Sequence, residues 1–149
     1  MISNKTAEAI VEEMLHVTWQ GMKTGDFDLF APCFHVPQVI ETFQGKRRLA
    51  NLQDLRDVFE SVRKFHASIG LVDLARHVVS AKMTTPEVIV ATHETRLVCA
   101  GNVLKRAPHP VMSEYRHIGG AWRVTHSQYA VESDGLHGRD TRPLGPRAD

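Results

Sequence analysis

Three side chains near the end of the chain are of types that carry out acid–base chemistry. Tyr115, His117 and His126 lie on either side of the Gly119-Gly120 step. A histidine titrates near neutral pH and can donate or accept a proton, while a tyrosine hydroxyl can donate a hydrogen bond to a developing oxyanion. These residue types favour a proton transfer, such as an isomerisation, a dehydration or a cyclisation, on a small carbonyl compound.

The diglycine step predicts which way these side chains point. Gly119-Gly120 is typical of a two-residue hairpin turn, because glycine tolerates positive φ at both positions. Side chains then alternate between the two faces along each paired strand. Glu114, Arg116 and Arg123 share one face, which must be the solvent side because a buried unpaired charge is costly. The opposite, inward face is expected to carry Val111, Ser113, Tyr115, His117, Trp122, Val124, His126 and Gln128.

An inward face with this many polar groups is more typical of a ligand cavity than of a closed core. His126 and Tyr115 are therefore the predicted catalytic residues. His93 is expected to lie near the same cavity, since the face of segment 88–99 that carries it is the more apolar one. The alternative interpretation is that these polar groups satisfy one another or the backbone. The side chains expected to line the pocket are Trp19, Thr42, His93, Ser113, His117, Trp122 and Gln128.

The sequence gives little evidence for a metal site or a bound cofactor. His93, His117 and His126 could converge on a metal ion, because histidine is a common ligand. They have no compact ligand spacing and no inward carboxylate beside them, so no metal site is predicted. The sequence also contains neither a phosphate-cradling glycine loop nor a dinucleotide fingerprint, so no cofactor is expected.

The elements that must position these side chains are helices first and strands later. Apolar residues recur at helical spacing over 7–18 and 52–62, and Asp26 is a suitable cap for a short helix between them. Segment 36–43 is β-branched and aromatic, which predicts a strand. Further strands are expected over 78–83, 88–99, 111–118 and 121–131. This order predicts an α+β fold, with helices on one face of a mostly antiparallel sheet.

The size and charge of the chain exclude several classes of protein. A length of 149 residues with 42% apolar residues is typical of one globular domain, and a net charge of +1 argues against a nucleic-acid partner. No secretory signal and no apolar run of the roughly 20 residues that span a membrane are present, so we expect a cytoplasmic protein without a membrane partner. Residues 133–149 are rich in glycine, proline and charge. They predict a flexible tail, or an arm ordered by a partner subunit, after a domain at residues 1–132.

The order of elements, together with the stretch Gly119-Gly120-Ala121-Trp122-Arg123-Val124, resembles the nuclear transport factor 2-like superfamily and, within it, the SnoaL-like branch. An ending of the type Gly-x-Trp-Arg-Val is frequent in the last hairpin of that superfamily. The resemblance covers about residues 5–132. It implies a cone-shaped α+β fold, in which a strongly curved mixed or antiparallel sheet and about three N-terminal helices enclose a pocket, and it implies a homodimer.

The resemblance leaves the activity open, because the superfamily contains both enzymes and non-catalytic modules. The general base of ketosteroid isomerase would fall near Thr42, which cannot take up a proton at neutral pH, and the adjacent Glu41 points to the other side of the strand. The expected function is binding of a small, largely apolar molecule, with His/Tyr chemistry of an isomerase, dehydratase or cyclase type. The alternative is a non-catalytic ligand-binding or dimerisation module that uses the outer face of the sheet around Arg116 and Arg123.

Overall fold

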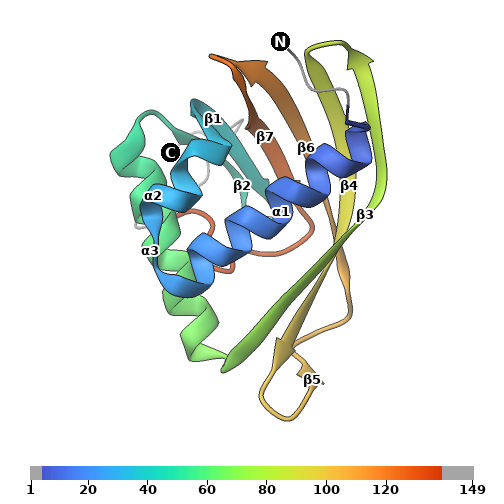
Figure 1. Ribbon diagram of the computed structural model, residues 1–149. Coiled ribbons are helices and arrows are strands. Elements are labelled where there is room, and N and C mark those ends of the chain that lie inside the picture. The colour runs from blue at the N-terminus through green and yellow to red at the C-terminus, as the bar shows by residue number, and fades with distance from the viewer. Residues whose placement is uncertain (1–4, 139–149) are drawn as a thin grey trace.

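A computed structural model describes residues 5–138 of the chain, and it consists of one curved sheet with helices against its concave face (Figure 1). Its elements are, in chain order, α1 (Ala7–Thr24), α2 (Phe27–Phe30), the 3-10 turn η1 (Ala31–Cys33), β1 (Phe34–Thr42), β2 (Gly45–Leu49), α3 (Leu52–Ser68), β3 (Leu71–Thr85), β4 (Val88–Cys99), β5 (Val103–Leu104), β6 (His109–Ile118) and β7 (Ala121–Tyr129).

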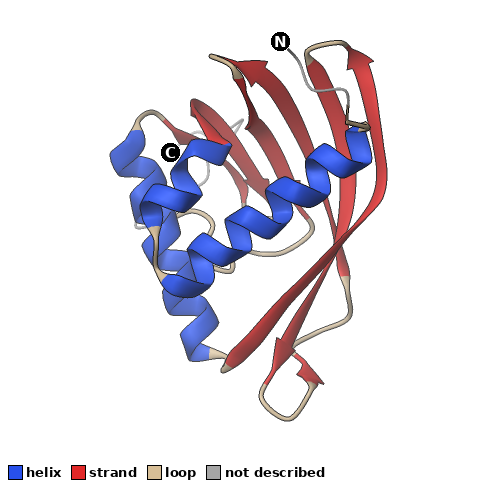
Figure 2. Cartoon of the chain, viewed as in Figure 1, coloured by secondary structure: helices blue, strands red, loops and turns tan. Residues whose placement is uncertain are grey.

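The strands form one mixed sheet in the order β2-β1-β7-β6-β4-β3, with the short β5 paired to β4. β1 and β7 run parallel, and the other neighbours are antiparallel. α1 crosses the concave face, while α2 and α3 cover the half of the sheet near β1 and β2 (Figure 2). The expected α+β fold, with three helices and a strongly curved mixed sheet, is confirmed.

Local signals set the helix ends. Asp26 accepts a hydrogen bond from the amide of Leu29, and Asn51 accepts one from the amide of Asp54, so both predicted caps are present. α1 is capped by Thr6. These caps satisfy amide groups that the first turn of each helix leaves without a partner.

Two apolar clusters fill the space between the helices and the sheet. One joins the first half of α1 to the central strands and contains Val11, Ile89 and Tyr115, which are at most 2% exposed. The other lies under α3 and contains Leu55 and Phe59, which are also at most 2% exposed. A cavity lies beside the second cluster, and its lining includes the buried residues Met22, Phe30, Ile40, Leu55, Val58 and Val62 of that cluster.

The hairpin between β6 and β7 begins as predicted. Gly119 and Gly120 have φ values of +60° and +83°, and His117 pairs with Trp122. Ser113 and Tyr115 point inward and are 6% and 2% exposed. The diglycine turn therefore sets the orientation of β6 correctly.

The orientation expected for the second half of β7 is wrong. Tyr115 pairs with Val124, but Glu114 pairs with His126, so Thr125 is an extra residue that forms a β-bulge. A bulge exchanges the two faces of the strand beyond it. Ser127 consequently points inward, 4% exposed, and pairs with Ser113.

His126 and Gln128 lie instead on the outer face, where both side chains contact the carboxylate of Glu41. The parallel pairing of Glu41 with Gln128 brings these residues together. The inward positions expected for His126 and Gln128 are therefore corrected to outward ones.

Residues 133–138 continue from β7 and fold back onto the domain. Asp134 forms an ion pair with Arg106 in the loop before β6. His137 is fully buried, and its Nε2 lies 3.2 Å from the hydroxyl oxygen of Thr42. This segment closes one end of the space between the helices and the sheet.

These contacts differ from the flexible tail that was predicted for residues 133–149. Composition alone did not predict these contacts. One of them is made by Gly135, at a position where few other residues would fit. A Cβ at Gly135 would lie 2.7 Å from the carbonyl oxygen of Ser61, and its φ of +83° also favours glycine. The rest of the predicted tail, residues 139–149, lies outside the described part of the chain. Within the described part, no helix is long and apolar enough to cross a membrane.

Candidate functional site

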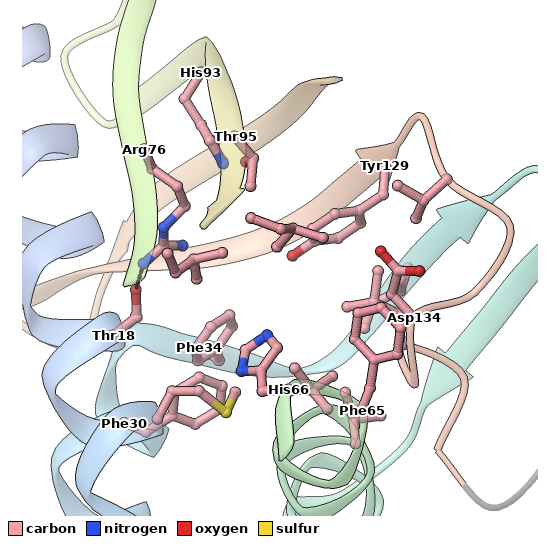
Figure 3. Close-up of a pocket in the computed structure, with 18 of the residues that line it drawn as sticks. Thr18, Phe30, Phe34, Phe65, His66, Arg76, His93, Thr95, Tyr129 and Asp134 are labelled. Carbon is pink, nitrogen blue, oxygen red and sulfur yellow. Dashed lines mark hydrogen bonds between the residues drawn. The ribbon is translucent and has the colours of Figure 1, made fainter. Parts of the chain in front are cut away.

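A cavity of about 110 Å³ lies between the helices and the concave face of the sheet (Figure 3). Most of its lining side chains are apolar, and aromatic rings form one wall. The ring centroids of Phe30 and Phe34 are 4.5 Å apart, and Phe59 stacks behind Phe30 at 4.8 Å. The polar side chains of the lining are Thr18, Gln38, His66, Arg76, His93, Thr95, His109, Tyr129 and Asp134.

Arg76 reaches the cavity from β3, opposite Thr95 on β4. Its Nη2 donates to the carbonyl oxygen of Leu15 at 2.7 Å and to the hydroxyl of Thr18 at 2.9 Å, so it ties β3 to α1. Burial lowers the pKa of Arg76 from its ordinary value of 12.5. A guanidinium remains charged at neutral pH despite such a shift.

Two imidazoles face the same cavity. His93 on β4 is 4% exposed, and burial, together with the positive charge of Arg76, lowers its pKa to about 3. Burial and Arg76 also lower the pKa of the half-buried His66 on α3, to about 4. Both rings are neutral at pH 7, where each can donate one hydrogen bond and accept another.

The hydroxyl of Tyr129 points into the cavity from the end of β7 (Figure 3). Burial raises the pKa of Tyr129, so the phenol is a neutral hydrogen-bond donor at pH 7. Tyr129 faces inward because of the bulge at Thr125, which reversed the alternation expected for this strand.

Asp134 closes the other side of the cavity. Its two carboxylate oxygens accept hydrogen bonds from Arg106 at 2.7 and 2.9 Å, in the two-pronged geometry that arginine and carboxylate favour. Its φ of +54° is in the left-handed region, which aspartate adopts more readily than most residues. His109 lines the cavity as well, and burial lowers its pKa.

Among the residues predicted for the pocket, the structure places His93 in the cavity wall. Ser113, Tyr115 and Trp122 lie inside the fold but nearer the hairpin, where α1 covers them. The cavity lies toward the other end of β6, at His109. These three side chains point inward but do not reach the cavity, because α1 packs against the sheet near the β6–β7 hairpin.

The other predicted residues also lie away from this cavity. His117 packs its ring against Trp122, with centroids 5.2 Å apart. Trp19 lines a separate depression between α1, α3 and β3, and Thr42 contacts the ring of His137. His126 is on the outer face of the sheet, so the predicted catalytic pair with Tyr115 is not brought together around the cavity. Within residues 5–138, no group of three or more histidine, cysteine or acidic side chains is arranged to hold a metal ion.

Of the nine polar residues of the lining, sequence reasoning predicted only His93; the eight that it missed include His66, Arg76, Tyr129 and Asp134. His66 could have been found, because it follows Val62 by four residues and so continues the apolar stripe of α3. Arg76 lay outside the strand expected at 78–83, whereas β3 begins at Leu71. No local sequence pattern indicated that Tyr129 or Asp134 would line the cavity.

Comparisons with known proteins identify the fold. No protein-family model matches the chain, and no curated protein matches it significantly. Among solved structures, the chain is similar to an NTF2-like protein of unknown function from Shewanella oneidensis MR-1, at 11% identity and a TM-score of 0.65, over 82% of this chain and 97% of that one. It is also similar to a domain of unknown function with a cystatin-like fold from Nostoc punctiforme PCC 73102, at 12% identity and a TM-score of 0.68, over 86% of this chain and 78% of that one. An NTF2-like protein with a cystatin-like fold from Novosphingobium aromaticivorans matches at 9% identity and a TM-score of 0.63, over 84% of this chain and 81% of that one. The chain therefore has the nuclear transport factor 2-like fold that its sequence resembled.

Proposed function

We propose that this protein binds a small, largely apolar molecule in the cavity between α1, α3 and the sheet. The observation that carries the proposal is an unfilled space of about 110 Å³ with mainly apolar walls. Protein interiors are close-packed and contain few voids larger than a water molecule. An apolar cavity of about 150 Å³ binds benzene, so the part of a ligand that this smaller cavity encloses is at most about one ring or a short chain.

The polar groups of the cavity favour binding over proton abstraction. An imidazole whose pKa is about 3, as in His93, is a weak base at neutral pH. Asp134 is the one carboxylate that lines the cavity in the described part of the chain, and its charge is already paired with Arg106. A reaction of the isomerase, dehydratase or cyclase type would need a stronger proton acceptor than these groups. We therefore propose a non-catalytic binding function ahead of an enzymatic one.

Filling the cavity tests this function. Val62 on α3 lines the cavity and is 8% exposed, so Val62→Phe places extra volume inside it. Benzamide, p-cresol and hexanol are suitable neutral probes, and isothermal titration calorimetry measures their binding. Wild-type protein is expected to bind at least one of them, and the variant to bind it about tenfold more weakly or worse.

The matched control is Val79→Phe on β3, where the valine is 62% exposed and away from the cavity. It should bind the probe as the wild type does. The proposed function is wrong if none of the probes, nor the acids described below, binds wild-type protein. It is also wrong if Val62→Phe binds as tightly as wild type while a thermal melt shows that it is folded.

We further propose that the protein forms a homodimer through the outer face of its sheet. Val90 and Met112 lie on neighbouring strands of this face and are 40% and 49% exposed. Two ion pairs flank them, one between Arg96 and Glu94 and one between Arg116 and Glu114. A patch with apolar residues between charges of both signs is self-complementary across a two-fold axis, which favours a second copy as its partner.

Light scattering after size exclusion measures the oligomeric state. We expect wild-type protein to elute with the mass of two 16.7 kDa chains, and Met112→Glu to elute with the mass of one, because a charge would be buried without a partner. Val103→Glu is the control, since Val103 is 61% exposed on the short strand β5. A single-chain mass for wild type at every concentration tested would rule out the dimer.

A further inference from the structure

The cavity contains one positive charge whose hydrogen-bonding capacity is only partly used. A guanidinium has five N–H groups, and Arg76 uses Nη2 for the carbonyl oxygen of Leu15 and the hydroxyl of Thr18. Within residues 5–138, no acceptor lies within hydrogen-bonding distance of its Nε or Nη1. Figure 3 shows the guanidinium at the cavity edge between Thr18 and His93.

This charge also lacks a carboxylate partner in the described part of the chain. Among the described arginines, Arg47, Arg96, Arg106 and Arg116 form ion pairs with an aspartate or glutamate. Arg76 forms none, and of the unpaired arginines in residues 5–138 it is the one that lines the cavity. Arg76 is half-buried, and a charge that is partly removed from water without a counter-charge is costly for the folded protein.

The titratable groups around Arg76 are neutral at pH 7. Its charge interacts with Tyr115, Tyr129 and the thiol of Cys33, and burial raises the pKa of all three. His66 and His93 are neutral as well, since their pKa values are about 4 and 3. The charge of Asp134, across the cavity, is paired with Arg106. The space beside Arg76 therefore carries about one uncompensated positive charge.

We propose that the natural ligand is a small monocarboxylic acid with an apolar body, whose carboxylate pairs with Arg76. The proposal rests on the proposed binding function and adds the chemical class of the ligand. A carboxylate supplies the missing single negative charge, and one of its oxygens can accept a hydrogen bond from Nε or Nη1, because Nη2 is already used. The aromatic wall of Phe30 and Phe34 would contact the apolar body.

A carboxylate fits this site better than a phosphate does. A phosphate monoester carries a charge of about −1.5 to −2 at pH 7, so a single arginine would leave excess negative charge in an apolar space. A carboxylate also has the smaller head group, which suits a cavity of about 110 Å³. The hydroxyl of Thr95 also lines the cavity and could donate to its oxygens.

Pairs of ligands that differ mainly in charge test the proposal. Benzoate against benzamide, and hexanoate against hexanamide, share their apolar body and approximate head shape. Calorimetry at pH 7 is expected to show that wild-type protein binds the acid of at least one pair about tenfold more tightly than its amide, or better. Arg76→Gln should lose most of this preference and bind the amide within about threefold of wild type, because it removes the charge and leaves the apolar walls in place.

The control is Arg96→Gln, on the adjacent strand. The side chain of Arg96 is 40% exposed and paired with Glu94 on the outer face, so both affinities should stay as in the wild type. Because Arg76 also connects β3 to α1, circular dichroism must show that the variant is folded. If it is not, Arg76→Lys, which keeps the charge, should retain a preference for the acid, and loss of that preference in a folded lysine variant would count against a charge pairing at this position.

The outcomes separate this proposal from the binding function on which it rests. Equal affinities of acid and amide in wild-type protein would overturn the carboxylate assignment and leave the apolar-ligand function intact. Binding of neither acids nor neutral probes would overturn both. A preference for the acid that Arg76→Gln retains in full would place the carboxylate elsewhere and overturn the role of Arg76.

Discussion

Replacing Phe59 with alanine is expected to lower the free energy of unfolding by about 3–5 kcal/mol, the usual cost of removing a buried aromatic ring. Phe59 is 0% exposed and lies at the centre of the cluster under α3. Its ring contacts Phe30 at a centroid distance of 4.8 Å and Phe27 at 5.3 Å. Its removal would leave a void that the neighbouring rings can fill only in part.

Urea denaturation followed by circular dichroism measures this effect. The control is Phe43→Ala, where the ring is 69% exposed and the expected change is within about 0.5 kcal/mol. The ring of Phe59 packs against Phe30, which lines the cavity, so the folded variant should also bind the probes more weakly. A loss of stability no greater than that of the control would show that the cluster does not pack as described.

The second large effect is a loss of stability in mild acid that originates at His93. Its pKa is about 3 in the folded protein and has an ordinary value of 6.5 in an unfolded chain. The unfolded state therefore binds the proton more tightly, so stability is fully present above pH 6.5 and is lost as the pH falls from there toward 3. The expected loss between pH 7 and pH 5 is about 2 kcal/mol from this residue.

His66 and His109 act in the same direction, since burial lowers the pKa of both, that of His66 to about 4, and the half-buried position of His66 makes its contribution smaller. Urea denaturation at several pH values between 5 and 7 measures the combined slope. This window lies above the range in which Glu41 and Glu114, whose pKa values are lowered, take up protons.

His93→Gln separates the contribution of His93 from the others. The variant should show a pH dependence about 2 kcal/mol smaller over this window, whatever its stability at pH 7. His16→Gln, at an exposed position of α1, is the control and should leave the slope as in the wild type. An unchanged slope in His93→Gln would show that the imidazole is not held neutral by burial.

The binding proposals give these two effects a functional meaning. The same surroundings that keep His93 neutral also surround the charge of Arg76, because both side chains face one cavity with mainly apolar walls. A bound carboxylate would compensate that charge and stabilise the folded state through binding linkage. Ligand binding and stability should therefore change together in this protein.

Features that depend on neighbouring residues could be predicted from the sequence. Asp26 and Asn51 cap their helices as expected, because a cap contacts an amide only a few residues away. Gly119 and Gly120 form the expected turn, and strict alternation from that turn correctly placed Ser113 and Tyr115 inside. His93 followed from the same period-two pattern on β4.

The alternation of side chains predicted the wrong face in β7, where the curved sheet contains a β-bulge. The bulge at Thr125 places one extra residue in β7, which turned Tyr129 into the cavity and His126 out of it. Bulges let a strand bend and twist more strongly, so their position depends on how the whole sheet curves around the helices. No residue in β7 marks that position by itself.

The sequence by itself determined the helices, the caps of α2 and α3, the diglycine turn and the alternation along β6 and β4, because these depend on residues close together along the chain. Only the tertiary structure decided where the cavity lies and which polar groups share it. Arg76 contacts residues of α1 that lie 58 and 61 positions earlier, and Arg106 pairs with Asp134, which lies 28 positions later. The burial of a charge is set by the distant segments that exclude water from it, and a local pattern of residues carries no record of those segments.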